Sequence, residues 1–340
     1  MILCFVPDSN TIHHFNQNKY DSFLRSIPFH QLPCSHCAHR GCLHRHAYYT
    51  RRLYIAEIDS FVIIRVLRVR CTRCGTTHAL LPHFVIPYQH IPLIDTASSY
   101  QNEKAVGDAI RKSGIPREEL FITTKAYIQE MGYEKTKLAF EWSLKNLGLD
   151  YLDLYLIHMP FGDYYGAWRA MEELYEQGKI RAVGVCNFLP DRLLDLCKNV
   201  RIRPMINQIE HHPHDQRDEE IALMKKLGVQ PEAWAPFAEG LKGMFSEPLI
   251  LELAQKYHKT PGQILLRWNI ENGCAVIPKT VHESRMRENL DIWDFQLSKQ
   301  DLERMKELDK GVPSMLDTRD INEIERVYAY LDDPVLTTLK

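Results

Sequence analysis

From residue 93 onward, short apolar runs of strand length alternate with longer amphipathic runs of helix length, and glycine or proline separates most of them. The expected strands are Leu93–Thr96, Leu120–Lys125, Leu152–His158, Ala182–Asn187, Met205–Glu210, Val229–Trp234 and Ala275–Lys279. The expected helices are Ala105–Lys112, Tyr133–Leu147, Tyr165–Gln177, Pro190–Lys198, Asp218–Leu227, Pro248–Tyr257 and Thr260–Glu271. Repeated strand–helix units predict an α/β fold with a parallel sheet, namely a TIM-type (β/α) barrel.

Polar or aromatic side chains stand at or near the ends of these strands. They are Asp95, Lys125, His158, Asn187, Gln208, Trp234 and Lys279, which Thr280 follows. Any one of them could be an ordinary strand-end residue at the surface. Because the carboxyl ends of parallel strands meet at one rim of a barrel, the set as a whole predicts an active site at that rim.

The stretch Leu-Ile-Asp-Thr-Ala-Ser-Ser-Tyr places Tyr100 five residues after Asp95. These groups suit hydride transfer to a carbonyl, which forms an alkoxide that needs a proton donor. Tyrosine ionises near pH ~10 and is too weak an acid unless its pKa is lowered. We expect the ammonium of Lys125 to lower the pKa of Tyr100, with Asp95 holding Lys125. His158 would orient the carbonyl oxygen, although each residue could instead form a surface ion pair.

Residues 93–340 resemble an aldo-keto reductase on three motifs. These are the run from Leu93 to Gly107, the run from Met171 to Phe188, and Ile277-Pro-Lys-Thr followed by Arg285, Glu288 and Asn289. The resemblance implies NADPH-dependent reduction of a small aldehyde or ketone to an alcohol. By resemblance Tyr100 is the general acid, and Asp95, Lys125 and His158 are its partners.

The same resemblance implies a set of cofactor ligands. They are Cys186, Asn187, Gln208 and Trp234 around the nicotinamide, and Lys279, Thr280, Arg285, Glu288 and Asn289 toward the adenosine end. Cys186 stands where serine is common in the family. Lys279, Thr280 and Arg285 also suit a phosphate by their own chemistry, because two cations and a hydroxyl lie near a helix start. The family binds the 2′-phosphate there, which favours NADP over NAD, and a solvated basic helix start is the alternative.

Residues 1–92 differ in composition from the rest of the chain. They carry a net charge of +6 against −8 for residues 93–340, and they hold ten of the 16 histidines and six of the nine cysteines. Two Cys-x-x-Cys pairs, Cys34/Cys37 and Cys71/Cys74, have the spacing of a four-thiolate zinc site. Residues 48–70 between them suit a β-hairpin. The long gap between the pairs, the spare ligand Cys42 and several histidines leave the ligand set open, and structural or redox cysteines are the alternatives.

Residues Leu32–Tyr88 resemble the N-terminal zinc-ribbon region of insertion-sequence transposases, and the resemblance includes the run from Arg68 to Pro82. The resemblance implies structural zinc and nucleic acid as a partner of residues 31–90. The basic strand Arg65–Arg73 could contact phosphates, and a solvated basic face is an equal alternative. We expect a poorly defined segment over 1–30, a zinc-ribbon-like domain over 31–90 and a reductase barrel over 93–340.

The reductase family begins with a strand and a helix that have no counterpart before Leu93. We therefore expect an incomplete barrel with two unpaired edges and an opened core, unless residues Phe61–Val69 supply a substitute strand. Such a barrel would have weak activity or none. The alternative is a zinc-ribbon protein that binds nucleic acid and carries an inactive reductase barrel.

No apolar run approaches the ~18 residues that a membrane-spanning helix needs. The N-terminal run from Met1 to Pro7 lacks the basic and apolar regions of a signal peptide. We therefore expect a cytoplasmic protein with no membrane contact.

Overall fold

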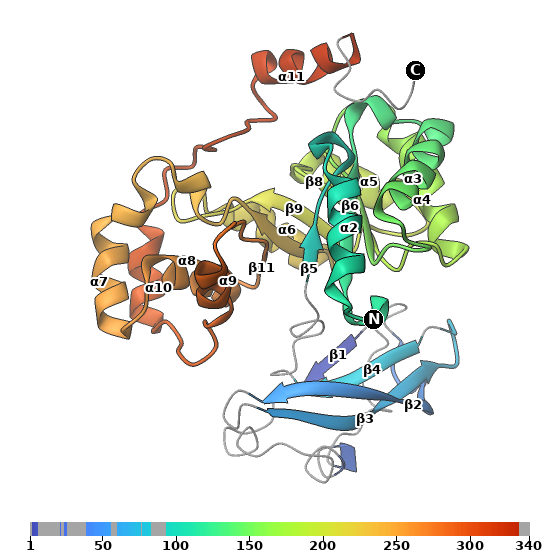
Figure 1. Ribbon diagram of the computed structural model, residues 1–340, viewed down its shortest axis with the longest axis horizontal. Helices are drawn as coiled ribbons and strands as arrows, with labels where there is room; N and C mark the ends of the chain where they lie inside the picture. The colour runs from blue at the N-terminus through green and yellow to red at the C-terminus, as the bar shows by residue number, and fades with distance from the viewer. Residues whose placement is uncertain are drawn as a thin grey trace. The chain divides into compact units, whose positions relative to one another are not determined.

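The computed structural model describes residues 2–5, 21, 24–25, 39–55, 60–75, 77–82 and 93–332. The chain forms two compact units, residues 1–92 and residues 93–340, and most contacts between residues fall within one unit or the other (Figure 1). Two of the four candidate zinc ligands, Cys34 and Cys37, lie outside the described residues, as does most of the segment 1–30.

The first unit contains a four-stranded sheet with the order β1-β4-β3-β2. Its strands are β1 (Ile2–Phe5), β2 (Leu43–Ile55), β3 (Ser60–Cys71) and β4 (Thr77–Pro82). β2 and β3 form the predicted antiparallel hairpin, and β1 runs parallel to β4. Residues Phe61–Val69 belong to β3 of this sheet, so the idea that they replace a barrel strand is wrong.

The second unit is built on a seven-stranded sheet in which all neighbouring strands run parallel (Figure 1). The strands are β5 (Leu93–Asp95), β6 (Phe121–Ala126), β7 (Leu154–Ile157), β8 (Val183–Cys186), β9 (Ile206–Glu210), β10 (Gln230–Trp234) and β11 (Ala275–Val276). Their order in the sheet follows their order in the chain, which confirms the predicted parallel α/β arrangement. β5 and β11 are the two edges among the described strands, so the barrel is incomplete.

A side-chain contact across the inner face shows that this sheet is curled. Gln208 Nε2 on β9 lies 3.1 Å from Asp95 Oδ2 on β5, although these strands are four places apart in the sheet. Neighbouring strands are about 4.8 Å apart, so a flat sheet would separate β5 and β9 by about 19 Å. The sheet must therefore curve around the space where the two side chains meet.

Helices follow the strands as the alternating pattern predicts. They are α2 (Glu103–Ser113), α3 (Tyr133–Leu147), α4 (Tyr164–Glu176), α5 (Pro190–Asn199), α6 (Asp218–Leu227), α7 (Pro248–Tyr257), α8 (Pro261–Glu271), α9 (Glu283–Leu290), α10 (Lys299–Lys306) and α11 (Ile321–Tyr328). Proline in the first turn begins α5, α7 and α8, where its missing N–H costs no helical hydrogen bond. None of the helices that the structure describes has the length and apolar character needed to cross a membrane.

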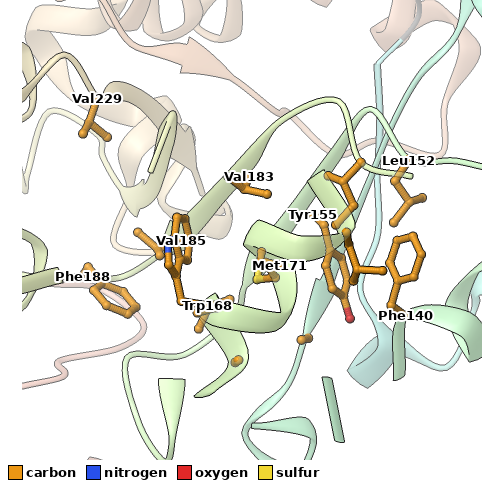
Figure 2. Close-up of a cluster of buried hydrophobic side chains, with 14 of the residues drawn as sticks. Phe140, Leu152, Tyr155, Trp168, Met171, Val183, Val185, Phe188 and Val229 are labelled. Atoms are coloured by element: carbon orange, nitrogen blue, oxygen red, sulfur yellow. The ribbon is translucent and has the colours of Figure 1, made fainter. Parts of the chain in front are cut away.

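The apolar core of this unit lies between the outer face of the sheet and helices α2 to α6. Figure 2 shows its centre, where Trp168 and Met171 of α4 lie near Val185 of β8. Phe140 of α3 packs edge-on against Tyr155 of β7, with ring centroids 5.4 Å apart. Because this outer layer buries the apolar side chains, the opposite face of each strand is available for polar groups.

Gly107 gives a direct test of how closely the helices approach one another. It lies on α2, and an added Cβ would stand 2.7 Å from the carbonyl carbon and 2.8 Å from the Cα of Leu147, at the end of α3. In an open helix Gly→Ala stabilises by about 1 kcal/mol. Here we expect Gly107→Ala to destabilise the protein by about 1–3 kcal/mol, because the backbone of α3 must move.

Urea unfolding followed by circular dichroism would measure this difference. Lys112→Ala, at an exposed position of the same helix, is the control and should change stability by less than about 0.5 kcal/mol. A Gly107→Ala protein as stable as the parent would contradict the close packing of α2 on α3.

Candidate active site

The inner face of the curled sheet is polar, in contrast to its outer face. Ile122 and Ala126 of β6 join the outer core, so strand alternation places Lys125 on the inner face. Gln208 of β9 and Glu232 of β10 lie opposite one another on that face, where Gln208 Nε2 donates to Glu232 Oε1 at 2.7 Å. The inner face thus concentrates ionisable groups that are cut off from water.

Lys125 lies at the centre of these groups, with its side chain completely buried. Its ammonium forms an ion pair with Asp95, donates to the carbonyl oxygen of Thr96 at 3.0 Å and lies 3.5 Å from the hydroxyl of Tyr100. Burial alone would lower the pKa of Lys125, but the Asp95 carboxylate outweighs burial and raises that pKa above its usual value. Lys125 is therefore a fixed positive charge at physiological pH.

Tyr100 lies in the short 3₁₀ helix η4 (Ser98–Tyr100), which follows β5. The residue is 50% exposed, yet its hydroxyl reaches the buried Lys125. Burial raises the pKa of Tyr100 above 10.0, Lys125 opposes this rise and Asp95 adds to it. The expectation that Lys125 makes the phenol more acidic overall is wrong for the protein alone, because burial and Asp95 together outweigh the cation. Tyr100 is accordingly protonated and ready to donate.

His158 completes the group of four residues predicted to be catalytic. Its ring meets that of Tyr100 edge-on, with centroids 5.5 Å apart, and its Nδ1 lies 3.3 Å from Ser99 Oγ. Burial, and then the charge of Lys125, hold the pKa of His158 well below its usual value, so the ring is neutral. When Ser99 donates to Nδ1, the ring hydrogen is on Nε2, where it can be donated to a carbonyl oxygen. The structure therefore brings all four predicted residues together.

Glu232 belongs to the same group but was not among the predicted site residues. Gln208 Nε2 donates to both Glu232 and Asp95, and so links the two carboxyls. Burial, and next the charge of Asp95, raise the pKa of Glu232 to about 7. An acidic residue inside the apolar strand Val229–Trp234 was the one sequence signal that could have found it.

Among the residues predicted to hold the nicotinamide, Asn187 contacts His158 directly. Asn187, in the left-handed region at φ 60°, donates from Nδ2 to the His158 carbonyl at 3.4 Å and accepts from Trp234 Nε1 at 2.9 Å. Burial raises the pKa of Cys186 well above its usual value, and its thiol lies 3.8 Å from Gln208 Oε1. Both amide hydrogens of Gln208 are already in use, so it can offer a nicotinamide only its carbonyl oxygen.

The residues predicted at the adenosine end lie on the segment from β11 through α9, in the order Lys279, Thr280, Arg285, Glu288 and Asn289. Lys279 and Arg285 are exposed, and neither forms an ion pair with any residue in the described part of the chain. The Glu288 carboxylate accepts a hydrogen bond from Thr260 at the start of α8. Two exposed cations without an internal counter-charge fit a bound phosphate.

In the first unit, three cysteines gather at the open end of the β2–β3 hairpin. Leu43 pairs with Cys71 in the ladder, so Cys42 at the start of β2 lies beside Cys71 at the end of β3. Burial opposes ionisation of Cys71, but hydrogen bonds from the Cys74 backbone and the Cys42 thiol lower its pKa to about 6. Over the described residues no group of three or more His, Cys, Asp or Glu side chains could hold a metal ion.

A cleft of about 420 Å³ lies apart from these groups, beside α3 and α4. It is lined by Tyr133, Tyr165, Arg169, Glu172, Glu173, Glu176, Asn199, Val200 and Arg201. None of the catalytic candidates lines it, and its acidic residues are engaged in surface pairs such as Lys137–Glu173 at 3.0 Å. The buried contacts around Lys125 therefore identify the candidate active site better than this cleft does.

Two protein families match the chain. Residues 88–310 match the Aldo/keto reductase family, and residues 34–115 match a domain of unknown function, DUF6431. The two matches overlap over residues 88–115, a stretch that includes Asp95 and Tyr100. Because the second family has no known function, the resemblance of the N-terminal part to transposase zinc ribbons stays a prediction.

Curated relatives of the chain include two reductases of small dicarbonyl compounds. Glyoxal reductase of Bacillus subtilis (strain 168) is 47% identical over 218 residues, which cover 64% of this chain and 78% of that protein. Methylglyoxal reductase DkgA of Escherichia coli (strain K12) is 45% identical over 221 residues, covering 64% of this chain and 80% of that protein.

Solved structures agree with this relationship. MGS-M4, an aldo-keto reductase from a Medee basin deep-sea metagenome library, aligns with a TM-score of 0.66 and 43% identity over 67% of this chain and 85% of its own. An aldo-keto reductase of Bombyx mori in complex with NADP aligns with a TM-score of 0.65 and 35% identity, over 69% of this chain and 85% of its own.

The electrostatics of the site can be tested by titrating Tyr100. We expect its phenol to titrate above pH 10 in the parent protein, because burial raises its pKa from 10.0. In Lys125→Met the pKa of Tyr100 should rise further, because the cation that opposes the effect of burial is lost.

NMR of ¹³Cζ-labelled tyrosine would follow this titration, with Tyr100→Phe to assign the resonance. Glu303→Gln, an exposed substitution on α10, should leave the titration unchanged. A parent Tyr100 that titrates well below pH 10 would show that Lys125 dominates burial after all.

Proposed function

The chain belongs to the aldo/keto reductase family, and we propose that it reduces the carbonyl group of a small aldehyde or ketone to an alcohol, with NADPH as cofactor. One observation carries this proposal: the hydroxyl of Tyr100 lies 3.5 Å from the buried ammonium of Lys125, which is paired with Asp95. A protonated phenol beside a fixed cation can release its proton when negative charge develops on a nearby oxygen.

NADPH, when bound, supplies the hydride. The groups that would hold its nicotinamide are Asn187, Gln208 and Trp234. Asn187 contacts His158 and Trp234, and Gln208 contacts Asp95. Lys279 and Arg285 would hold its 2′-phosphate, because they are exposed cations that suit a phosphate. An aldo-keto reductase structure in complex with NADP, to which this chain is similar, supports this choice of cofactor.

Residues of the chain itself orient the substrate, donate the proton and stabilise the charge that remains. Neutral His158 donates a hydrogen bond from Nε2 to the carbonyl oxygen and so orients the substrate. Tyr100 gives its proton to that oxygen as it becomes an alkoxide, and the Lys125 ammonium stabilises the phenolate that remains. Asp95 keeps Lys125 charged and in place.

The relatives indicate which substrates to test first. Two of them are named as reductases of glyoxal and of methylglyoxal, which are small dicarbonyl compounds. We also propose that turnover is weaker than in these relatives, because β5, which carries Asp95, is an edge strand in the described sheet.

Tyr100→Phe tests the assignment of the acid. We expect it to lower kcat for methylglyoxal by about 100-fold or more, because proton transfer to the alkoxide is lost. NADPH binding, followed by fluorescence, should stay within about twofold of the parent, since the phenyl ring is kept.

Tyr165→Phe, which removes a hydroxyl from the outer cleft, is the matched control and should leave kcat unchanged. Parent-like turnover in Tyr100→Phe would contradict the role of Tyr100. If the parent protein turned over as fast as the relatives, this would contradict only the proposal that its activity is weakened.

A second candidate function, for residues 1–92, is the binding of structural zinc by Cys34, Cys37, Cys71 and Cys74. The observation that favours it is the turn at Cys71–Cys74, where the backbone N–H of Cys74 points at Cys71 Sγ at 3.5 Å and Cys42 lies close by. Backbone N–H groups directed at a sulfur stabilise a thiolate, which is the form that binds zinc. Binding of nucleic acid by the basic strand would be a further property of this unit.

Elemental analysis of purified protein should find roughly one zinc per chain, because four thiolates complete a tetrahedral site. Cys71→Ala and Cys74→Ala should lose it, whereas Cys197→Ala, a buried cysteine of the second unit, should keep it. Protein isolated without zinc, and unable to take it up after reduction, would contradict this candidate. Salt-sensitive DNA binding by the same samples would support the nucleic-acid partner.

A further inference from the structure

We propose that the buried carboxyl of Glu130 is a positioning residue, which holds the two turns that carry Tyr100 and Tyr127 in the arrangement that carbonyl reduction needs. This inference rests on the proposed function, since it assigns a role in that same site. Glu130 ends the 3₁₀ helix η6 (Ile128–Glu130), which follows β6. It is 1% exposed and lies outside the group of four catalytic residues.

One oxygen of Glu130 joins the turns that follow two neighbouring strands. Glu130 Oε2 accepts from Ser98 Oγ at 2.7 Å, in the turn after β5, and from the backbone N–H of Tyr127 at 2.7 Å, in the turn after β6. The Glu130 backbone is itself anchored, because its carbonyl oxygen accepts from Thr136 Oγ1 of α3 at 2.7 Å. The carboxyl is thus a fixed point between both turns.

Each of these turns places a group that the reaction uses. Ser98 is the first residue of η4, whose next two residues are Ser99, beside His158 Nδ1, and Tyr100, beside Lys125. On the other side, the ring of Tyr127 packs edge-on against His158 with centroids 5.5 Å apart. Loss of the Glu130 carboxyl would therefore loosen the acid and the orienting imidazole together.

Ser98 also connects Glu130 to the strand that carries Lys125. Its hydroxyl has one hydrogen but faces two acceptors, Glu130 Oε2 and the Lys125 carbonyl oxygen at 3.0 Å. While Glu130 is ionised, the Ser98 hydroxyl can donate to only one of these acceptors at a time. When Glu130 is protonated, its hydroxyl donates to Ser98, which then donates to the Lys125 carbonyl oxygen. Burial, opposed by the Ser98 and Tyr127 hydrogen bonds and reinforced by the charge of Glu103, raises the pKa of Glu130 to about 7.

The experiment compares Glu130→Ala, Glu130→Gln and Ser98→Ala, with Glu172→Ala as a matched control. Glu172 is also a buried carboxyl that accepts two backbone N–H groups, from Arg201 at 2.7 Å and Ile202 at 2.8 Å, but it lies on α4 away from the site. Glu172→Ala removes the same kind of contact and tests for a merely structural effect.

We expect Glu130→Ala and Ser98→Ala to lower kcat for methylglyoxal about 10- to 100-fold, because the reacting groups lose alignment. KM for NADPH should stay within about twofold, since no cofactor ligand is touched. Glu130→Gln, which keeps the length and an acceptor oxygen, should restore kcat to within about threefold of the parent. Glu172→Ala should lower Tm without lowering kcat.

Hydrogen exchange by mass spectrometry gives a readout that does not depend on activity. Exchange over residues 97–101 and at Tyr127 should accelerate in Glu130→Ala and not in Glu172→Ala. Parent-like kcat in both Glu130→Ala and Ser98→Ala, or an equal loss of kcat in Glu172→Ala, would overturn the inference. An inactive parent protein would refute the proposed function, and unchanged exchange in Glu130→Ala would then separately refute the role of Glu130 in holding the turns. If Glu130→Ala does not fold, Ser98→Ala and Glu130→Gln decide the outcome.

Discussion

The buried ion pair between Lys125 and Asp95 is the interaction on which the second unit depends. An ammonium with no exposed side-chain surface is stable only when it is paired and hydrogen-bonded, because its desolvation would otherwise cost several kcal/mol. Asp95 supplies the counter-charge from the neighbouring strand, and Thr96 supplies an acceptor. This pairing requires β5 and β6 to lie side by side in register, so the charge that we propose for the chemistry also specifies the local arrangement of the sheet.

The pair also determines the protonation of its surroundings. The positive charge of Lys125 helps to hold His158 neutral, while burial keeps the phenol of Tyr100 protonated. Burial, and next the charge of Asp95, raise the pKa of Glu232, so the inner face carries less negative charge than its two carboxyls suggest. A neutral hydrogen-bond donor and a protonated acid therefore face the same space. A carbonyl group requires this combination when its carbon accepts a hydride and its oxygen becomes an alkoxide that takes up a proton.

The strands and helices that follow the periodicity of apolar residues were predictable from the sequence. The candidate site residues that lie in sequence motifs were predictable as well. Lys125 lies at the end of a strand-like run and Tyr100 lies in the motif that follows Asp95. Each was recognisable from a short continuous stretch of sequence, so the four catalytic candidates could be named without coordinates. Glu130 could not be found in this way, because its partner Ser98 lies 32 residues away and neither residue looks unusual in its own segment. The direction of the pKa shift of Tyr100 also depends on how deeply the phenol is buried, and burial cannot be derived from the order of residues in the chain. The sequence also left open whether Phe61–Val69, now part of β3, replaces the missing barrel strand, because length and β-propensity cannot tell which sheet a strand joins.

The edge position of β5 makes the contacts across the barrel interior especially important. β5 is only three residues long and has one hydrogen-bonded neighbour among the described strands. A strand in a complete barrel is held on both sides, whereas Asp95 is held on one side by β6 and across the interior by Gln208 of β9. The turn after β5 gains a further attachment where Ser98 meets Glu130. Side-chain hydrogen bonds therefore replace part of the support that a second neighbouring strand would give to β5. They hold the residues nearest to Tyr100.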